Sequence, residues 1–97
     1  MNNIRPQLAP LYSGDHFKVL EVTGDAGADM PLHYCTSEAV INVQDGRAIL
    51  TIDDKEKELF RGTVILLPAN KVHSLKITEN LKAFVVMAKE AAIKFAS

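Results

Sequence analysis

The chain has 97 residues, a mass of 10.7 kDa and a formal net charge of −1. This length predicts one domain, residues 1–97, that buries roughly 60–65 % of its unfolded surface. Leu, Ile, Val and Phe supply 29 of the 97 residues, which argues against disorder. No cluster of Lys and Arg favours nucleic-acid binding, and the apolar runs are too short to span a bilayer.

The amino end and the cysteine content indicate the compartment. Residues Met1 to Gln7 are polar and include Arg5 and Pro6, unlike a secretory signal. Cys35 is the only cysteine, so no disulfide forms within the chain. We therefore expect a protein of the reducing cytoplasm.

Frequent turn residues separate short segments rich in Val, Ile, Leu and Thr, a pattern typical of all-β sandwiches and barrels. Turns are expected at Asp45-Gly46 and Glu79-Asn80, among others. In chain order, the expected strands cover residues 17–22, 39–43, 47–53, 64–67, 72–77 and 81–87. The first two are apolar on both faces, which fits strands covered on both sides or a face buried against a partner chain.

Two further segments break this pattern. Asp53 to Glu58 is the most polar run, and it predicts a solvated hairpin tip between Ile52 and Leu59. Ala88 to Ala96 places apolar residues at steps of three and four, which predicts one short carboxyl-terminal helix. His16 follows Asp15 in a turn and is expected at the surface.

Residues 27–46 and residues 62–77 each carry a motif of glycine and histidine residues at defined spacings. In the first, Gly27 is followed after five residues by His33-Tyr34-Cys35, and Gly46 closes the segment. In the second, Gly62 is followed after five residues by Pro68-Ala69-Asn70, and then by His73. Fifteen residues separate the two motifs. The chain thereby resembles the cupin superfamily, which implies an all-β double-stranded β-helix, or jelly-roll barrel.

The resemblance also implies a metal site inside the barrel, and here the sequence departs from the family. Cupins bring two His and a Glu from the first motif, and one His from the second, onto a divalent metal such as Zn, Fe, Mn, Ni or Cu. His33 and His73 are retained, whereas Cys35 stands at the second His position and Ala39 at the Glu position. Glu38 lies one residue away and reaches the centre only if the register shifts.

Two interpretations of these residues stay open. In the first, a Cys35 thiolate joins His33 and His73 as the third ligand of a transition metal. In the second, the two histidines are neutral pocket residues and Cys35 is a small buried hydrophobe. The expected pocket wall consists of His33, Cys35, Ile41, Val43, Leu50, His73, Leu75 and Val85.

Three functions follow from these alternatives. The first is a single-domain cupin that binds a small molecule inside the barrel. The second is a metal-dependent enzyme of the oxygenase or isomerase type, and the sequence does not decide between binding and catalysis. The third is a structural homodimer with a vestigial pocket. A homodimer is expected in all three, because burial against a second copy enlarges a small core.

Overall fold

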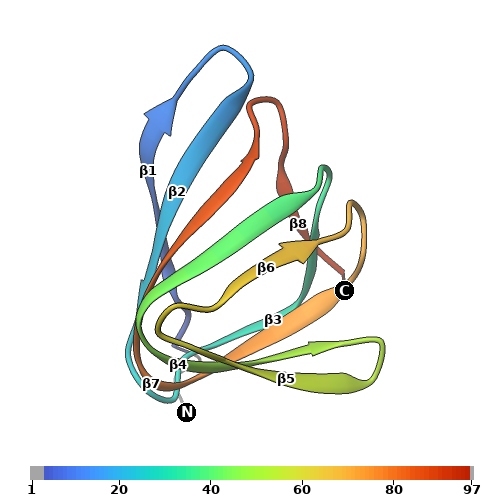
Figure 1. Cartoon of the computed structure of the whole chain (residues 1–97). Helices are drawn as coiled ribbons and strands as arrows, with labels where there is room; N and C mark the ends of the chain where they lie inside the picture. Colours follow the sequence, from blue (N-terminus) through green and yellow to red (C-terminus); the bar gives the residue numbers. More distant parts are fainter. Residues whose placement is uncertain (1–3, 97) are drawn as a thin grey trace.

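The structure is a computed structural model that describes residues 4–96. It contains eight β-strands and, within this range, no helix (Figure 1). The strands are β1 (Gln7–Ser13), β2 (Phe17–Gly24), β3 (Asp29–Cys35), β4 (Ala39–Ile52), β5 (Lys55–Phe60), β6 (Val64–Leu67), β7 (His73–Ala88) and β8 (Ile93–Phe95). The all-β jelly roll predicted from the sequence is confirmed. The limits of the expected domain, residues 1 and 97, lie outside the described range.

Two long antiparallel strands, β4 and β7, form the spine of the molecule (Figure 1). The first half of β4 pairs with the second half of β7, and this sheet continues through β6 on one side and through β2 and β1 on the other. The remaining halves pair with each other and carry β5, β3 and β8. We call these the first and the second sheet. Each sheet has five strands, because β4 and β7 contribute to both, and the two sheets curl around a common interior.

Gly46 marks the point where β4 passes from one sheet to the other. Its φ is +86°, and the pairing with β7 is irregular between Val43 and Ala48. A Cβ at this position would lie 1.9 Å from the backbone oxygen of Asn80. The expected turns at Asp45-Gly46 and Glu79-Asn80 are therefore corrected: both are irregularities inside continuous strands, because a bulge bends a strand without ending it.

Two further turns use residues other than glycine at positive φ. Asp53 and Asp54 have φ of 55° and 61°, which is the backbone of a two-residue hairpin between β4 and β5. The polar run thus forms a hairpin as predicted, but its tip is only two residues long, and Lys55 already belongs to β5. Asn70, between β6 and β7, has φ of 63°, a conformation that Asn tolerates better than most residues.

The carboxyl-terminal helix predicted over Ala88 to Ala96 is wrong. β7 ends at Ala88, and β8 pairs with β3. Thr36 holds the approach to β8 in place: its N–H donates to the Ala92 carbonyl at 3.0 Å, and its Oγ1 accepts from the Ala92 N–H at 2.9 Å. An isolated helix of nine residues is marginal, whereas pairing with the exposed edge of β3 satisfies the backbone of both segments.

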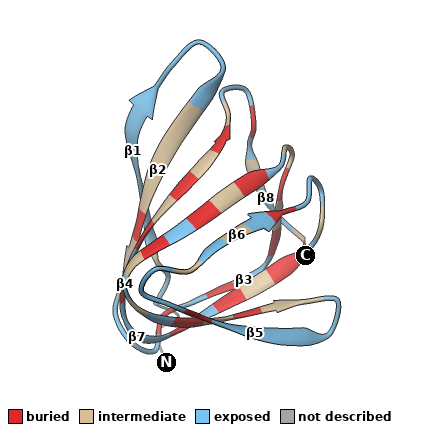
Figure 2. Ribbon diagram, viewed as in Figure 1, coloured by how far each residue is buried: buried red, intermediate tan, exposed pale blue. Residues whose placement is uncertain are grey.

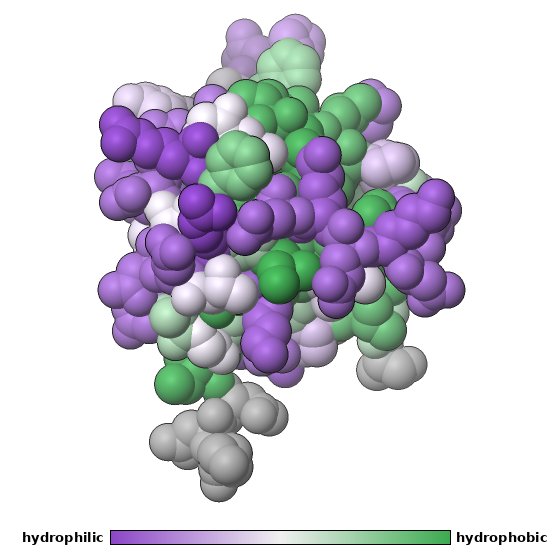
Figure 3. Space-filling view, turned by 60° about the horizontal axis from the view of Figure 1, so that its bottom comes forward, coloured by the Kyte–Doolittle hydropathy of each residue, from purple (hydrophilic) through white to green (hydrophobic). Residues whose placement is uncertain are grey.

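The core lies between the two sheets and follows the alternation of the strands (Figure 2). In β7, every second residue from Leu81 to Met87 is buried, and β4 shows the same period from Ala39 to Val43. The outside is mostly hydrophilic in the view of Figure 3, with hydrophobic residues gathered towards its top. Among residues 4–96 there is no helix long and apolar enough to cross a membrane.

Candidate functional site

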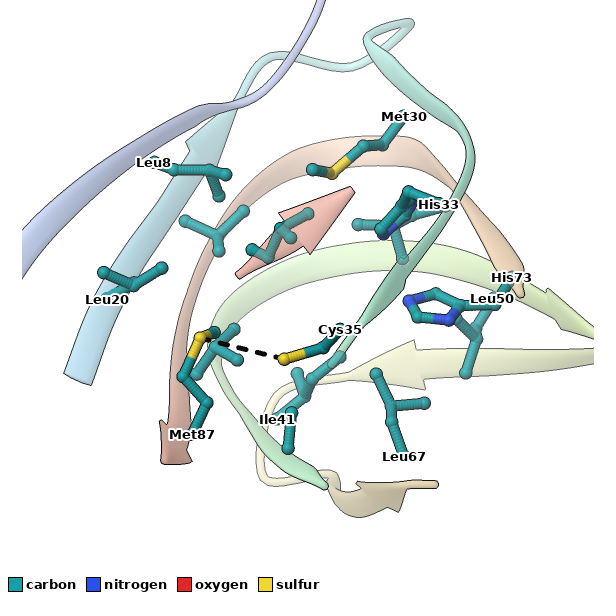
Figure 4. A pocket seen from close by; sticks show the side chains of 15 residues that line it. Leu8, Leu20, Met30, His33, Cys35, Ile41, Leu50, Leu67, His73 and Met87 are labelled. Carbon is teal, nitrogen blue, oxygen red and sulfur yellow. Dashed lines mark hydrogen bonds between the residues drawn. The ribbon is translucent and has the colours of Figure 1, made fainter. Parts of the chain in front are cut away.

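A cavity of about 50 Å³ lies between the sheets (Figure 4). Its wall is apolar except for two imidazoles and a thiol. Seven of the eight residues expected from the sequence line it, namely His33, Cys35, Ile41, Leu50, His73, Leu75 and Val85. The eighth, Val43, lines a second cavity of about 30 Å³ that shares Val22, Ile41, Leu75 and Val85 with the first.

The two histidines face each other across neighbouring strands. His33 on β3 and His73 on β7 are direct register partners, and their ring centroids lie 4.2 Å apart at an interplanar angle of 63°. Only 6 % and 4 % of their surfaces are exposed. The Phe95 ring of β8 packs 5.9 Å from the His33 ring on its other side. The pair is therefore held from two strands inside the barrel.

Each imidazole is oriented by the backbone carbonyl two residues before it in the chain. Nδ1 of His33 lies 2.7 Å from the Pro31 carbonyl oxygen, and Nδ1 of His73 lies 2.9 Å from the Lys71 carbonyl oxygen. A carbonyl can only accept, so Nδ1 of each neutral ring carries the proton and Nε2 carries the lone pair. Among the described residues, no fully buried side-chain nitrogen lacks a hydrogen-bond partner, so neither Nε2 is an enclosed and unsatisfied atom. Both rings therefore have an acceptor nitrogen left for a molecule in the cavity.

Burial keeps both rings neutral. Desolvation lowers the pKa of His33 and of His73 below 6.5, although the hydrogen bonds at Nδ1 act in the opposite direction. The proximity of His73 lowers the pKa of His33 further. Near neutral pH the cavity therefore presents two uncharged acceptors rather than a cationic pair.

Cys35 lines the cavity that contains the histidine pair, whereas Glu38 does not. The Cys35 thiol is buried, and its Sγ lies 3.9 Å from Met87 Sδ (Figure 4). The same Sγ lies 3.9 Å from Ser37 Oγ. The Glu38 side chain is exposed, and its neighbour Ala39 is the residue that lines the cavity. His16 is exposed in the turn between β1 and β2, outside both motifs.

Comparison with known proteins agrees with this architecture. Residues 20–88 match the family model described as Cupin domain. The chain is a cupin. A comparison with curated proteins gave no match.

Solved structures show the same fold. An RmlC-like cupin from Desulfovibrio desulfuricans is 25 % identical, with 88 % of this chain and 83 % of that one aligned at a TM-score of 0.77. A double-stranded β-helix protein from Klebsiella pneumoniae is 16 % identical over 99 % of this chain and 83 % of the other, at a TM-score of 0.82. The DMSP lyase DddQ from Ruegeria pomeroyi is 19 % identical, at a TM-score of 0.85. The alignment covers 95 % of this chain and 52 % of the lyase.

The metal ligands implied by the cupin resemblance fit this interior only in part. His33 and His73 supply two imidazole nitrogens, but no group of three His, Cys, Asp or Glu side chains converges among residues 4–96. The methyl group of Ala39 replaces a carboxylate, and the Cys35 sulfur contacts Met87. Two protein ligands hold a divalent metal weakly. The three-ligand set of His33, His73 and Cys35 therefore gains no support from the geometry.

Sequence reasoning missed eight residues of the cavity wall. Two come from the edge of the first sheet, Leu8 on β1 and Leu20 on β2. The strand β1 itself was not expected, because Pro10 interrupts the segment. The others are Val22, Met30, Ala39, Leu67, Met87 and Ile93. The period-2 pattern of β7 already placed Met87 on the inner face and was the one available signal for it.

Proposed function

We propose that this cupin binds a compact, mainly apolar small molecule that donates a hydrogen bond to the histidine pair. The observation that carries the proposal is the orientation of the two rings. Each Nδ1 is occupied by the backbone carbonyl two residues before it, which leaves two acceptor nitrogens in an otherwise apolar cavity. A few placed polar groups on an apolar wall are typical of ligand sites.

Size and polarity define the ligand class. A water molecule needs about 10–15 Å³ of such a cavity, so about 50 Å³ accommodates a ligand portion of only a few heavy atoms. Two neutral acceptors select a hydroxyl or N–H group and disfavour a ligand end that only accepts, since that end and the Nε2 atoms would be left without hydrogen bonds. Short alcohols and small N–H heterocycles belong to this class.

The test compares isopropanol with acetone, which have equal numbers of heavy atoms but differ in the donor. For four heavy atoms, the best small ligands gain up to about 6 kcal/mol, so isopropanol should bind with a dissociation constant no lower than ~40 µM. Titrations followed by backbone amide NMR should show saturable shifts around the cavity with isopropanol. Acetone should produce at least about tenfold weaker binding.

Two variants make this titration specific. His73→Asn retains an amide N–H near the position of Nδ1 but removes the acceptor that faces the cavity. It should weaken isopropanol binding about tenfold, whereas the surface variant His16→Asn should not change it. Equal affinity for the two test ligands, or wild-type affinity in His73→Asn, would contradict the proposal.

The alternatives predict other measurements. A metal-dependent enzyme of the oxygenase or isomerase type predicts stoichiometric Zn, Fe, Mn, Ni or Cu in protein purified without a histidine tag, and this result would replace the present proposal. A purely structural homodimer predicts an interior that binds neither test ligand. The cytoplasmic location and the homodimer remain predictions from the sequence.

A further inference from the structure

The mouth of the main cavity lies between the edge strands of the two sheets. Of the side chains that line this cavity, three are partly exposed, namely Leu8 of β1, Leu20 of β2 and Ile93 of β8, and the others are buried. Within residues 4–96, β1 pairs only with β2, and β8 pairs only with β3. A molecule in the cavity therefore reaches solvent between β1 and β8, past these three side chains.

Lys18 lies beside this mouth, on the inner side of the first sheet. It is two residues from Leu20 on β2, so both side chains emerge on the same face of the strand. Its register partner on β7 is Met87, which also lines the cavity. Its Nζ donates to the carbonyl oxygen of Ala91 at 2.6 Å, and Ala91 is two residues before Ile93. Lys18 is thus bordered by three parts of the cavity wall.

The positive charge of Lys18 stands in apolar surroundings and has no counter-ion. Asp15 and Glu90 lie in the turns next to it, but among residues 4–96 no carboxylate forms an ion pair with Lys18. A partly buried ammonium group is unfavourable unless an anion pairs with it. The Ala91 carbonyl supplies an acceptor but no negative charge. The inner-face residues next to it on β2 and β7 are all apolar, namely Leu20, Val22, Ala83, Val85 and Met87.

We propose that Lys18 binds a carboxylate of the ligand at the mouth, while the other end of the ligand donates to the histidine pair. The ammonium group carries three protons and Ala91 accepts one of them, so two donors remain. One cation balances one carboxylate, whereas a phosphate group, with about two negative charges, would stay half neutralised. The ligand is therefore a short acid with a hydroxyl or N–H group at its far end. This assignment rests on the proposed function for that far end.

The cavity sets the length of this ligand. Met87, the neighbour of Lys18, lies on the opposite side of the cavity from His73 (Figure 4). Along the wall, Cys35 is two residues from His33, a step of about 6.8 Å, and its Sγ lies 3.9 Å from Met87 Sδ. The Cβ atoms of register partners such as Met87 and Lys18 are about 5 Å apart. These steps place the histidine pair and the ammonium group roughly 10–15 Å apart. With about 3 Å for each hydrogen bond, a chain of about four to six carbons spans the rest.

The test compares ω-hydroxyhexanoate with ω-hydroxyhexanamide, which share the chain and the hydroxyl group and differ in charge. Backbone amide NMR of the full chain follows both titrations at neutral pH and low salt, where screening is weak. The wild type should bind the acid about tenfold more tightly, because a hydrogen bond to a charged acceptor is about twice as strong as one to a neutral acceptor. The acid should also shift the amide signals of Lys18 and Ala91, whose mutual hydrogen bond adjoins the carboxylate.

Three variants locate the effect. Lys18→Gln keeps an N–H donor for the Ala91 carbonyl but removes the charge, so it should bind the acid and the amide equally to within about twofold. Lys18→Arg keeps the charge and should still prefer the acid. Lys82→Gln is the matched control, because it removes the same charge from an exposed position on β7 where Lys82 pairs with Glu21 at 3.5 Å. Its preference for the acid should equal that of the wild type.

The assignment of Lys18 is wrong if the wild type binds the acid and the amide equally, if the preference survives in Lys18→Gln, or if Lys82→Gln loses it as well. The isopropanol titration separates this failure from a failure of the proposed function. If isopropanol binds and the acid is not preferred, only the carboxylate site is rejected. If none of the three compounds binds, the carboxylate site and the proposed function are both rejected.

Discussion

Replacing Gly46 by alanine tests whether β4 must approach β7 closely where the two sheets join. At φ of +86° an alanine is strained, and its Cβ would lie 1.9 Å from the Asn80 oxygen and 2.9 Å from the Leu81 Cα. Gly62 is the matched control. Its φ is +91°, but an added Cβ would meet no atom within 4 Å. The two variants therefore share the backbone strain and differ in the collision.

The magnitudes follow from these two terms. An unfavourable φ costs about 1–3 kcal/mol in either variant. The collision in Gly46→Ala forces β4 away from β7 and weakens about two backbone hydrogen bonds, each worth about 0.5–1.5 kcal/mol, while steric contacts with Leu81 add to this. We expect Gly46→Ala to lower the free energy of unfolding by ~3–5 kcal/mol and Gly62→Ala by ~1–3 kcal/mol.

Urea denaturation of both variants and the wild type, with a common slope, measures the difference. A domain of this size has about 5–15 kcal/mol of stability, so both variants should remain foldable. Equal losses in the two variants would show that the close approach at Asn80 does not contribute, and the account of the junction would be wrong.

Two further predictions concern the interior. Because burial lowers the pKa of His33 and His73 below 6.5, the unfolded chain takes up protons first as the pH falls. The contribution of these two groups to the free energy of unfolding should therefore be fully present above pH 6.5 and should decline below it. Urea midpoints at about pH 7.5 and about pH 5.5 measure this decline. It should be smaller in the His33→Asn/His73→Asn variant. Ala39→Glu places a carboxylate in the cavity wall that the two histidines share; it should destabilise the zinc-free protein by ~2–4 kcal/mol, and Zn²⁺ should restore about 2.7 kcal/mol at a hundredfold excess over its dissociation constant. Residue 43 lines the second cavity, so Val43→Glu should be destabilised without rescue by zinc. Thermal melts of both variants with and without Zn²⁺ measure the two effects.

The sequence predicted the parts of the fold that local chemistry determines. Alternation identified the inner faces of β4 and β7, and the polar run that begins at Asp53 identified the hairpin between β4 and β5. The motif spacing predicted that His33 and His73 face one interior, and the two residues are register partners there. These features depend on neighbours within a few residues or on a family pattern.

Features set by distant partners were not predictable in the same way. The segment after Ala88 has helical periodicity, but the edge of β3 and the Thr36 side chain recruit it as β8. Gly46 looked like a turn because nothing nearby in the sequence indicates the Asn80 backbone that it must admit. The direction of the Cys35 sulfur likewise depends on Met87, which lies 52 residues further along the chain.

The central claim is that Nε2 of His33 and of His73 are the acceptors for a donor ligand in the cavity. Imidazole ¹⁵N NMR of the uniformly labelled protein reports the protonation of each ring nitrogen directly, and the exposed His16 serves as an internal control. The account predicts that both buried rings are neutral with the proton on Nδ1 at neutral pH, and that isopropanol, but not acetone, shifts their Nε2 signals while those of His16 stay constant. Protons on Nε2 in the free protein, or Nε2 signals that do not respond to isopropanol, would contradict it.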